Sequence, residues 1–324
     1  MPATIPQVKT LPLLIICGPT ASGKTALAIE LSRHFDLEVV SADSRQVYRG
    51  LDIGTAKATA EERRQVPHHL VDVVNPDEEF SVADFIRQAS AAVERIHGRG
   101  KLPVVVGGTG LYIKGLTEGL LAAPSGDQGV RERLLELERE QGEGTLYRRL
   151  SEVDPTLAER LPPGDLLRIV RALEVFAISG RRLSEFQQEH AFDERPYETM
   201  KIALAPAREI LYPRINRRVE QMFAEGLLDE VRHLLDRGFS PELKSMRTIG
   251  YRESIRHLQG RLTRDEAVAL IQRDTRRYAK RQLTWFRRDK SIIWVDSFAE
   301  SAKIQKFIEH FMQRTRSGYG QDPF

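Results

Sequence analysis

The chain has 324 residues, of which 41% are apolar and 29% charged, so it is long enough for one large domain or two ordinary ones and can form a core. The single cysteine, Cys17, excludes an intramolecular disulfide framework and a cysteine-based zinc cluster, which favours a reducing, cytoplasmic location. No apolar run approaches the roughly 18 residues that a membrane-spanning helix needs, so no membrane association is expected.

The net charge of +3 conceals an uneven distribution of charged residues. Residues 1–118 carry a net charge of −1, residues 119–200 carry −5 and residues 201–324 carry +9. The stretch 243–290 alone holds 14 basic and 5 acidic side chains. Such a stretch is either a solvated face or a site for a polyanion, and composition does not distinguish the two.

Short apolar runs alternate with helical patterns in the first part of the chain. The runs expected to form strands are 11–17, 37–42, 69–74, 103–106 and 201–205, with a last one at 292–295. Helical patterns separate the first four runs, and this alternation predicts an α/β fold in which helices flank a parallel sheet. The clearest helix follows Ser81, where Ser81 and Asp84 have capping-box spacing, and it is expected to end at Gly98.

Strand patterns are absent between residues 119 and 200, where helical signals and negative charge predominate. The best-marked helix of this stretch runs from Asp165 to Ser179 and is followed by Gly180. We therefore expect 119–200 to be an all-helical subdomain inserted into a catalytic core made of 1–118 and 201–324.

The C-terminal part of the core is expected to be helical and basic. One helix is predicted over 206–237, and another begins at Thr263, which has capping-box spacing with Glu266, and runs towards Trp285. The tail 317–320 is expected to be frayed.

The segment from residue 18 to residue 25 fits the phosphate-binding pattern G-x-x-x-x-G-K-S/T, and it lies between a strand and a helix as that pattern requires. Its members are Gly18, Pro19, Thr20, Ala21, Ser22, Gly23, Lys24 and Thr25. The glycines allow backbone amides to converge on an anion, Lys24 supplies a positive charge, and Thr25 is placed to contact Mg²⁺. The segment predicts a polyphosphate site but does not distinguish a nucleoside triphosphate from another pyrophosphate ester.

Two further polar side chains follow the ends of the second and fourth predicted strands. In a parallel sheet these ends face the same crevice as the phosphate-binding segment. Asp43 is a candidate general base or Mg²⁺ partner, and the alternative is that it caps the next turn. Thr109 follows Gly107 and Gly108 and is the one side chain there that can both donate and accept a hydrogen bond.

The stretch Asp43–Lys57, DSRQVYRGLDIGTAK, closely resembles the signature of bacterial tRNA dimethylallyltransferases, also called tRNA isopentenyltransferases. Further blocks resemble the same family in the same order, at 107–112, 168–175, 247–252 and 278–287. The chain departs from the family pattern at Ala58, Gly164 and Leu167, where the family usually has a proline, part of an Asn-Asp pair and a polar residue.

The resemblance implies transfer of a dimethylallyl group from dimethylallyl diphosphate to N6 of the adenosine 3′-adjacent to the anticodon, position 37, with release of pyrophosphate. The phosphate-binding segment and Mg²⁺ then stabilise the leaving pyrophosphate, Asp43 accepts the N6 proton, and Thr109 orients the base. The family also places an arginine on the pyrophosphate, and both Arg214 and Arg218 match that motif.

The resemblance also implies binding of the tRNA anticodon stem-loop, by a protein that we expect to be a monomer. The implied tRNA contacts are Asp43, Ser44, Arg45, Gln46, Thr109, Arg131, Leu167, Arg168, Ile169, Val170, Arg171, Arg247, Arg252, Arg273, Arg277, Lys280, Arg281 and Arg287. Within this set Arg273, Arg277 and Lys280 have the spacing of one helical face, which suits phosphates. Trp285 and Phe286 either pack in the core or stack on a base, and core packing is favoured.

Two other functions fit part of the pattern. An ATP-dependent small-molecule or nucleoside kinase would use the phosphate-binding segment for ATP and the insertion as a lid, but it does not explain the Asp43 block. An RNA-binding protein with a degenerate nucleotide site does not explain why Lys24, Thr25 and Asp43 are all present.

Overall fold

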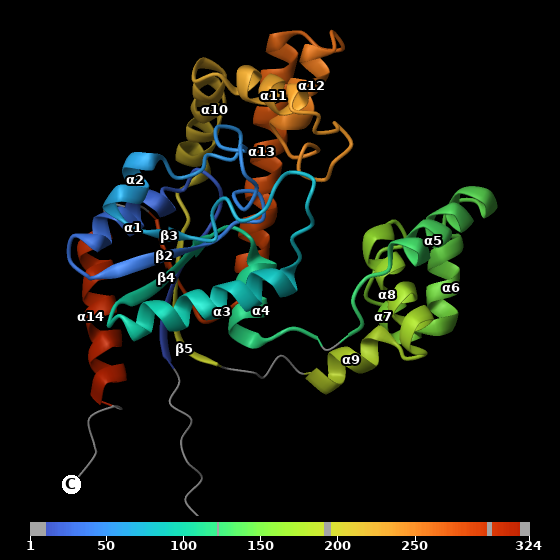
Figure 1. Ribbon diagram of the computed structural model, residues 1–324. Coiled ribbons are helices and arrows are strands. Elements are labelled where there is room, and N and C mark those ends of the chain that lie inside the picture. Colours follow the sequence, from blue (N-terminus) through green and yellow to red (C-terminus); the bar gives the residue numbers. More distant parts are fainter. Residues whose placement is uncertain (1–10, 122, 191–195, 297–299, 318–324) are drawn as a thin grey trace, which may run out of the picture. The chain divides into compact units, whose positions relative to one another are not determined.

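The computed structural model describes residues 11–121, 123–190, 196–296 and 300–317 (Figure 1). The chain forms two compact units, which we call the core unit (1–117 and 195–324) and the helical unit (118–194). Each unit has its own hydrophobic cluster of buried side chains. Within the described residues no helix is long and apolar enough to cross a membrane.

A six-stranded parallel sheet lies at the centre of the core unit, so the expected α/β fold is confirmed. The strands are β1 (Leu11–Cys17), β2 (Leu37–Ala42), β3 (His68–His69), β4 (Leu102–Gly107), β5 (Tyr197–Leu204) and β6 (Ile292–Val295). Their order is β3-β2-β4-β1-β5-β6, so β1 lies inside the sheet between β4 and β5. Because every pair is parallel, the ends of β1, β2 and β4 lie along one edge.

Helices cover both faces of this sheet and continue beyond its carboxyl edge (Figure 1). The helices of the core unit are α1 (Lys24–Ser32), α2 (Ala60–Gln65), α3 (Val82–Gly98), α4 (Gly110–Glu118), α10 (Arg208–Ala224), α11 (Leu227–Asp236), α12 (Tyr251–Leu258), α13 (Arg264–Phe286) and α14 (Ser301–Ser317). Leu14 and Ile16 of β1 face α1 and α14, whereas Leu13 and Ile15 face α3. The period of two along β1 thus fills both layers of the core.

α10 and α13 run antiparallel and in contact, as their side-chain pairs show. Ile215 of α10 clusters with Ala279 of α13, and Phe223 near the end of α10 lies under the guanidinium of Arg264 at the start of α13. Between these points Gln272 donates to the Asn216 carbonyl oxygen. The two helices therefore form one wall at the carboxyl edge of the sheet.

The helical unit contains helices only, within its described residues. They are α5 (Gln128–Gln141), α6 (Thr145–Val153), α7 (Pro155–Ala158), α8 (Leu166–Ser179) and α9 (Leu183–His190). α8 begins after Asp165, whose side chain accepts from the Arg168 amide, and ends at Gly180 with a φ of 68°. This confirms the helix expected there, because the cap and the left-handed glycine are both local signals.

Two strand predictions were wrong in their bounds. The strand expected at 69–74 is only His68–His69, because Leu70 and Asp72 have positive φ angles of 61° and 57° and end the extended run. β5 begins at Tyr197 instead of residue 201, since its first residues pair with the start of β1. The stretch 197–200 is therefore part of the sheet and not of the insertion.

One helix prediction was also wrong, and one helix was not predicted. The helix expected over 206–237 is interrupted between α10 and α11, where Gly226 has a φ of 99° that a helix interior does not allow. α14 was not predicted, although Ile304, Ile308 and Phe311 recur on one helical face and are buried against the sheet. The frayed tail expected at 317–320 lies outside the described residues except for Ser317, which ends α14.

The end of β4 leaves no space for a side chain at Gly107, where a β-carbon would overlap the carbonyl group of Ala42 on β2. Gly107→Ala is expected to lower the free energy of unfolding by about 1–3 kcal/mol, because two backbone segments must move apart. The measurement is denaturant unfolding, with Gly98→Ala as the control, since a β-carbon at Gly98 meets nothing within 4 Å. Equal stability of the two variants would contradict the close approach of β2 and β4.

Candidate active site

A cavity of about 540 Å³ opens at the carboxyl edge of the sheet. Its walls come from the phosphate-binding segment after β1, the ends of β2 and β4, the loop 54–58, the segment 247–249, and the facing sides of α10 and α13. Lys24, Thr25 and Asp43 all line it, so the structure brings together the three residues that the pattern singled out.

The phosphate-binding segment folds tightly around its own lysine. Gly18 has a φ of 129°, and a β-carbon there would lie 2.5 Å from the Leu204 carbonyl oxygen, so only glycine fits. The Lys24 ammonium donates to the carbonyl oxygens of Gly18 at 3.1 Å and Pro19 at 2.8 Å. Ser22 is buried, and its hydroxyl has no hydrogen-bond partner in the described structure.

Burial makes Lys24 electrostatically unusual. Loss of solvent, followed by the positive charge of nearby Arg218, lowers the pKa of Lys24 to about 8. Burial also lowers the pKa of Arg218. Two cations that face one cavity form a site for an anion.

The structure distinguishes the two candidate arginines of α10. Arg218 lines the cavity, whereas Arg214 is exposed and does not. The two residues lie one turn apart on the same side of α10, so the cavity reaches that side of the helix at Arg218 but not at Arg214.

Asp43 caps the turn after β2 and faces the cavity at the same time. Its Oδ1 accepts from the amides of Arg45 at 2.8 Å and Gln46 at 3.3 Å. Oδ2 receives no hydrogen bond from the described residues. The alternatives considered for Asp43, a cap or a base, are therefore compatible, because each uses a different oxygen.

Thr109 is tied to both neighbouring walls of the cavity. Its hydroxyl oxygen accepts from the Ser44 amide at 3.2 Å, and it is also hydrogen-bonded to Tyr278 of α13. Burial, followed by the negative charge of Asp43, raises the pKa of Tyr278, so this phenol stays protonated.

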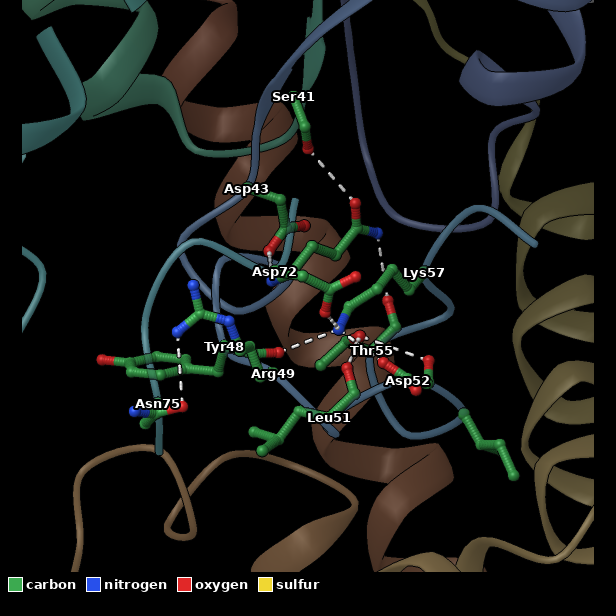
Figure 2. A network of polar contacts seen from close by, with 12 residues as sticks. Ser41, Asp43, Tyr48, Arg49, Leu51, Asp52, Thr55, Lys57, Asp72 and Asn75 are labelled. Carbon is green, nitrogen blue, oxygen red and sulfur yellow. Dashed lines mark hydrogen bonds and ion pairs between the residues drawn. The ribbon is translucent and has the colours of Figure 1, made fainter. Parts of the chain in front are cut away.

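Most of the Asp43–Lys57 stretch serves to hold its own shape, as Figure 2 shows. The Lys57 side chain is 1% exposed, and its ammonium donates to the Tyr48 carbonyl oxygen at 2.8 Å and to the carboxylates of Asp52 at 2.5 Å and Asp72 at 2.6 Å. A buried ammonium needs such partners, and removing one of them is costly.

Gln46 has a similar internal role. Its Nε2 donates to the carbonyl oxygens of Thr55 at 3.3 Å and Ala56 at 3.2 Å, and its Oε1 accepts from the Ser41 hydroxyl at 3.2 Å. The amide that was predicted to contact tRNA is thus engaged in shaping the wall formed by residues 54–56.

The opposite end of the cavity is apolar. Val219 and Met222 of α10, Ile249, and Ile271 of α13 line it there. Ile271 lies eleven residues before Gln282 on α13, a rise of about 16 Å along the helix, and Gln282 contacts the phosphate-binding segment. The cavity therefore runs from a cationic end at the phosphate-binding segment to an apolar end between α10 and α13.

The residues of the helical unit that were predicted to contact tRNA fall into two groups. Leu167 is 84% exposed and Arg168 is also exposed, at the start of α8. The side chains of Ile169 and Val170 are buried in the hydrophobic cluster of this unit, so they are not available for RNA contact.

Arg131 and Arg171 are engaged within the helical unit. Both pair with the fully buried carboxylate of Glu174, at 2.8 Å and 2.5 Å. Glu174 also accepts from the Asp127 amide, and Arg171 donates to the Pro124 carbonyl oxygen. The two arginines therefore hold the start of α5 against α8, whatever else they contact.

In the core unit the predicted basic face of α13 is exposed at Arg273, Arg277 and Lys280. Asp274 pairs with Arg273 at 2.8 Å, Arg277 at 3.6 Å and Arg252 at 3.2 Å, so part of this charge is compensated locally.

The remaining predicted contacts of the core unit are spread around the cavity and along α13. Ser44, Arg45, Arg247 and Arg281 line the cavity, and Arg287 is exposed at the end of α13. Trp285 and Phe286 pack in the core, as expected: Phe286 is buried, and the Trp285 indole occupies the place of a β-carbon at Gly110.

The donor chemistry of the cavity fits Mg²⁺. Thr25 and Asp43 offer a hydroxyl and a carboxylate, and Mg²⁺ prefers oxygen ligands. Within the described residues no three His, Cys, Asp or Glu side chains form a metal cluster, so a metal here would need oxygens from a bound phosphate as well.

Sequence reasoning missed two residues of α13 that reach the site. Tyr278 contacts Thr109, and Gln282 contacts both the phosphate-binding segment and Gly108. Both lie in the 278–287 block, of which only the basic residues and the aromatic pair Trp285 and Phe286 were considered as RNA contacts. Their spacing of four residues on one helical face was the available signal.

Family models and curated relatives that match this chain all belong to one family of transferases. A family model described as IPP transferase matches residues 46–289, and one described as isopentenyl transferase matches residues 11–72. A tRNA dimethylallyltransferase of Syntrophotalea carbinolica is 58% identical over 93% of this chain and 96% of its own length. One of Syntrophobacter fumaroxidans is 54% identical over 92% of this chain and 87% of its own length.

Two solved structures are also similar. The tRNA isopentenylpyrophosphate transferase of Bacillus halodurans matches with a TM-score of 0.70 and 41% identity, covering 94% of this chain and 98% of that one. A eukaryotic dimethylallyltransferase described as acting on tRNA matches with a TM-score of 0.77 and 29% identity, covering 90% of this chain and 75% of that one.

The lowered pKa of Lys24, about 8, predicts how anion binding depends on pH. Below this pH the ammonium is charged and binds an anion. As the pH rises above 8 the free protein loses that charge, so the dissociation constant for inorganic pyrophosphate is expected to rise by about tenfold per pH unit. Calorimetric titration from pH 6.5 to 9.5 measures this rise.

Lys24→Arg is the matched control, because its guanidinium stays charged over this pH range. The titration of pyrophosphate itself affects both proteins equally, so it drops out of the ratio of their dissociation constants. The ratio of the wild-type to the Lys24→Arg dissociation constant should be constant up to about pH 8 and increase above it. A ratio that stays flat over the whole range would contradict a lowered pKa at Lys24.

Proposed function

Because the chain belongs to the tRNA dimethylallyltransferase family, we propose that it transfers a dimethylallyl group from dimethylallyl diphosphate to N6 of the adenosine 3′-adjacent to the anticodon, position 37. The observation that carries the proposal is the cavity with a cationic end at Lys24 and Arg218 and an apolar end at Met222 and Ile271. An isoprenoid diphosphate has the same two ends.

The cationic end is suited to a leaving diphosphate. Negative charge builds on the diphosphate as its allylic C–O bond breaks, and Lys24, which is held by two carbonyl oxygens of the phosphate-binding segment, and Arg218 line the cavity before the reaction. Such preorganised charges stabilise a transition state more than the ground state. Thr25 would hold Mg²⁺ against the diphosphate, and the ion supplies additional positive charge there.

The transfer step needs an acceptor for one proton. The adenine N6 lone pair forms the new bond to the allylic carbon while the C–O bond to the diphosphate breaks, and N6 then loses a proton. Asp43 lines the cavity and is the group that accepts it, through Oδ2, which has no donor among the described residues, while Oδ1 remains bound to the turn. Thr109, held between Ser44 and Tyr278, orients the base beside Asp43.

The exposed cations are the proposed tRNA-binding groups. On the core unit these are Arg273, Arg277 and Lys280 of α13, and on the helical unit Arg168 at the start of α8, where the apolar Leu167 is exposed beside it. Phosphate contacts position an RNA, and the target adenosine must leave its stack to enter the cavity. Since cytoplasmic tRNA is the substrate, we place the protein in the cytoplasm.

A kinase function is not favoured. The apolar end of the cavity presents aliphatic side chains, and the relatives that match most of the chain are named as tRNA dimethylallyltransferases. Neither observation indicates a binding site for the phosphoryl acceptor that a kinase needs.

The test is incubation of the purified protein with labelled dimethylallyl diphosphate, Mg²⁺ and unmodified tRNA, followed by mass spectrometry of the nucleosides and mapping of the labelled position. We expect N6-isopentenyladenosine at position 37 and release of pyrophosphate. Asp43→Asn preserves the Oδ1 acceptor of the turn and is expected to lower kcat by about 10²- to 10⁴-fold while tRNA still binds. Hydrolysis of ATP without label in RNA would refute the proposal.

Arg218 and Arg214 form a matched pair for the diphosphate contact. Arg218→Met is expected to raise the KM for dimethylallyl diphosphate by about 10- to 100-fold, since a charge-assisted contact in a buried site is lost. Arg214→Met should stay within about twofold of the wild type, because this side chain is outside the cavity. Steady-state kinetics at saturating tRNA measures both, and equal effects would contradict the assignment.

A further inference from the structure

Gln282 is a buried side chain that joins two loops bordering the cavity. It is 6% exposed and lies on α13. Its Oε1 accepts from the Thr20 amide at 2.9 Å, and its Nε2 donates to the Gly108 carbonyl oxygen at 3.0 Å. Thr20 belongs to the phosphate-binding segment after β1, and Gly108 belongs to the turn after β4.

The two bonds together require an uncharged side chain that has a donor and an acceptor. One end must accept and the other must donate, and at this length only glutamine does both without first taking up a proton. A leucine does neither, and an ionised glutamate accepts at both ends. The fit is also close, because a β-carbon at Gly108 would overlap the Gln282 amide.

Gln282 acts together with a second residue of the same helix face. Tyr278, four residues earlier, is hydrogen-bonded to Thr109. α13 therefore contacts successive residues of the turn after β4, and through Gln282 it also contacts the phosphate-binding segment. The relative position of these two loops depends on one helix.

We propose that Gln282 is a positioning residue that sets the phosphate-binding segment relative to the Gly108–Thr109 turn. This inference rests on the proposed function, in which the first loop holds the diphosphate and the second orients the adenine. The reacting carbon and nitrogen must approach within about 3–3.5 Å, and a displacement of about 1 Å is expected to lower the rate about 100-fold. One amide thus fixes the distance between the two substrates.

The experiment compares Gln282→Leu with Gln272→Leu. Gln272 lies on the same helix and also makes side-chain amide bonds, to the Asn216 carbonyl oxygen at 3.3 Å and to Glu220 at 3.2 Å, but it does not line the cavity. Transfer rates are measured with varied dimethylallyl diphosphate at saturating tRNA, and the tRNA dissociation constant is measured by filter binding.

Gln282→Leu is expected to lower kcat/KM for dimethylallyl diphosphate about 100-fold, while the tRNA dissociation constant changes by less than about twofold. Gln272→Leu should keep both quantities within about twofold of the wild type. A kcat/KM of Gln282→Leu within twofold of the wild type would overturn the inference. An equal loss in both variants would also overturn it, because the effect would then come from a loosened α13.

Two further measurements keep the inference testable if Gln282→Leu does not fold. In Gln282→Glu a protonated carboxyl can donate to Gly108 and accept from Thr20, so its activity relative to the wild type should rise as the pH falls, and a flat ratio counts against Gln282. Hydrogen exchange of the wild-type Thr20 amide should be slow, and fast exchange overturns the bond itself. If the wild-type protein shows no transfer activity, the proposed function is refuted. The hydrogen-exchange rate of the Thr20 amide then still tests the bond to Gln282.

Discussion

The position of β1 between β4 and β5 is the constraint on which the site depends. Parallel pairing brings the carboxyl ends of β1, β2 and β4 to one edge, so Lys24, Asp43 and Gly108 meet although they are far apart in sequence. The backbone contact between Gly18 and Leu204 shows how closely this edge is packed. A shift of one strand would displace the phosphate-binding segment from the residues that face it.

Buried charge and hydrogen bonding then hold the loops that leave this edge. Lys57 ties together the segment after β2, and Glu230 of α11 accepts from three successive amides at residues 52–54 and from the Tyr251 hydroxyl. Each of these groups would be costly to bury alone, so their pairing specifies one arrangement of the loops. The wall formed by residues 52–57 is held in place by the hydrogen bonds and ion pairs of Lys57 and Glu230 behind it.

Local signals predicted the parts of this structure that depend on local causes. The phosphate-binding segment, the capped helices after Ser81 and Thr263, and the helix that ends at Gly180 follow from short patterns, and the structure contains them. The choice between Arg214 and Arg218 was not predictable, because the two share one side of α10 and the choice depends on how far along the helix the cavity extends. The strand at β3 was predicted too long, since its end depends on positive φ angles at Leu70 and Asp72, which the residue pattern does not reveal.

The contact of Lys24 with its own loop has a consequence for product release. The ammonium donates to the Gly18 and Pro19 carbonyl oxygens, so its charge has acceptors within the protein itself. When pyrophosphate leaves, these two carbonyls are available to take its place. Release of the product is then an exchange of hydrogen-bond acceptors at Lys24 Nζ. The charge that binds the diphosphate therefore does not have to slow the release of pyrophosphate.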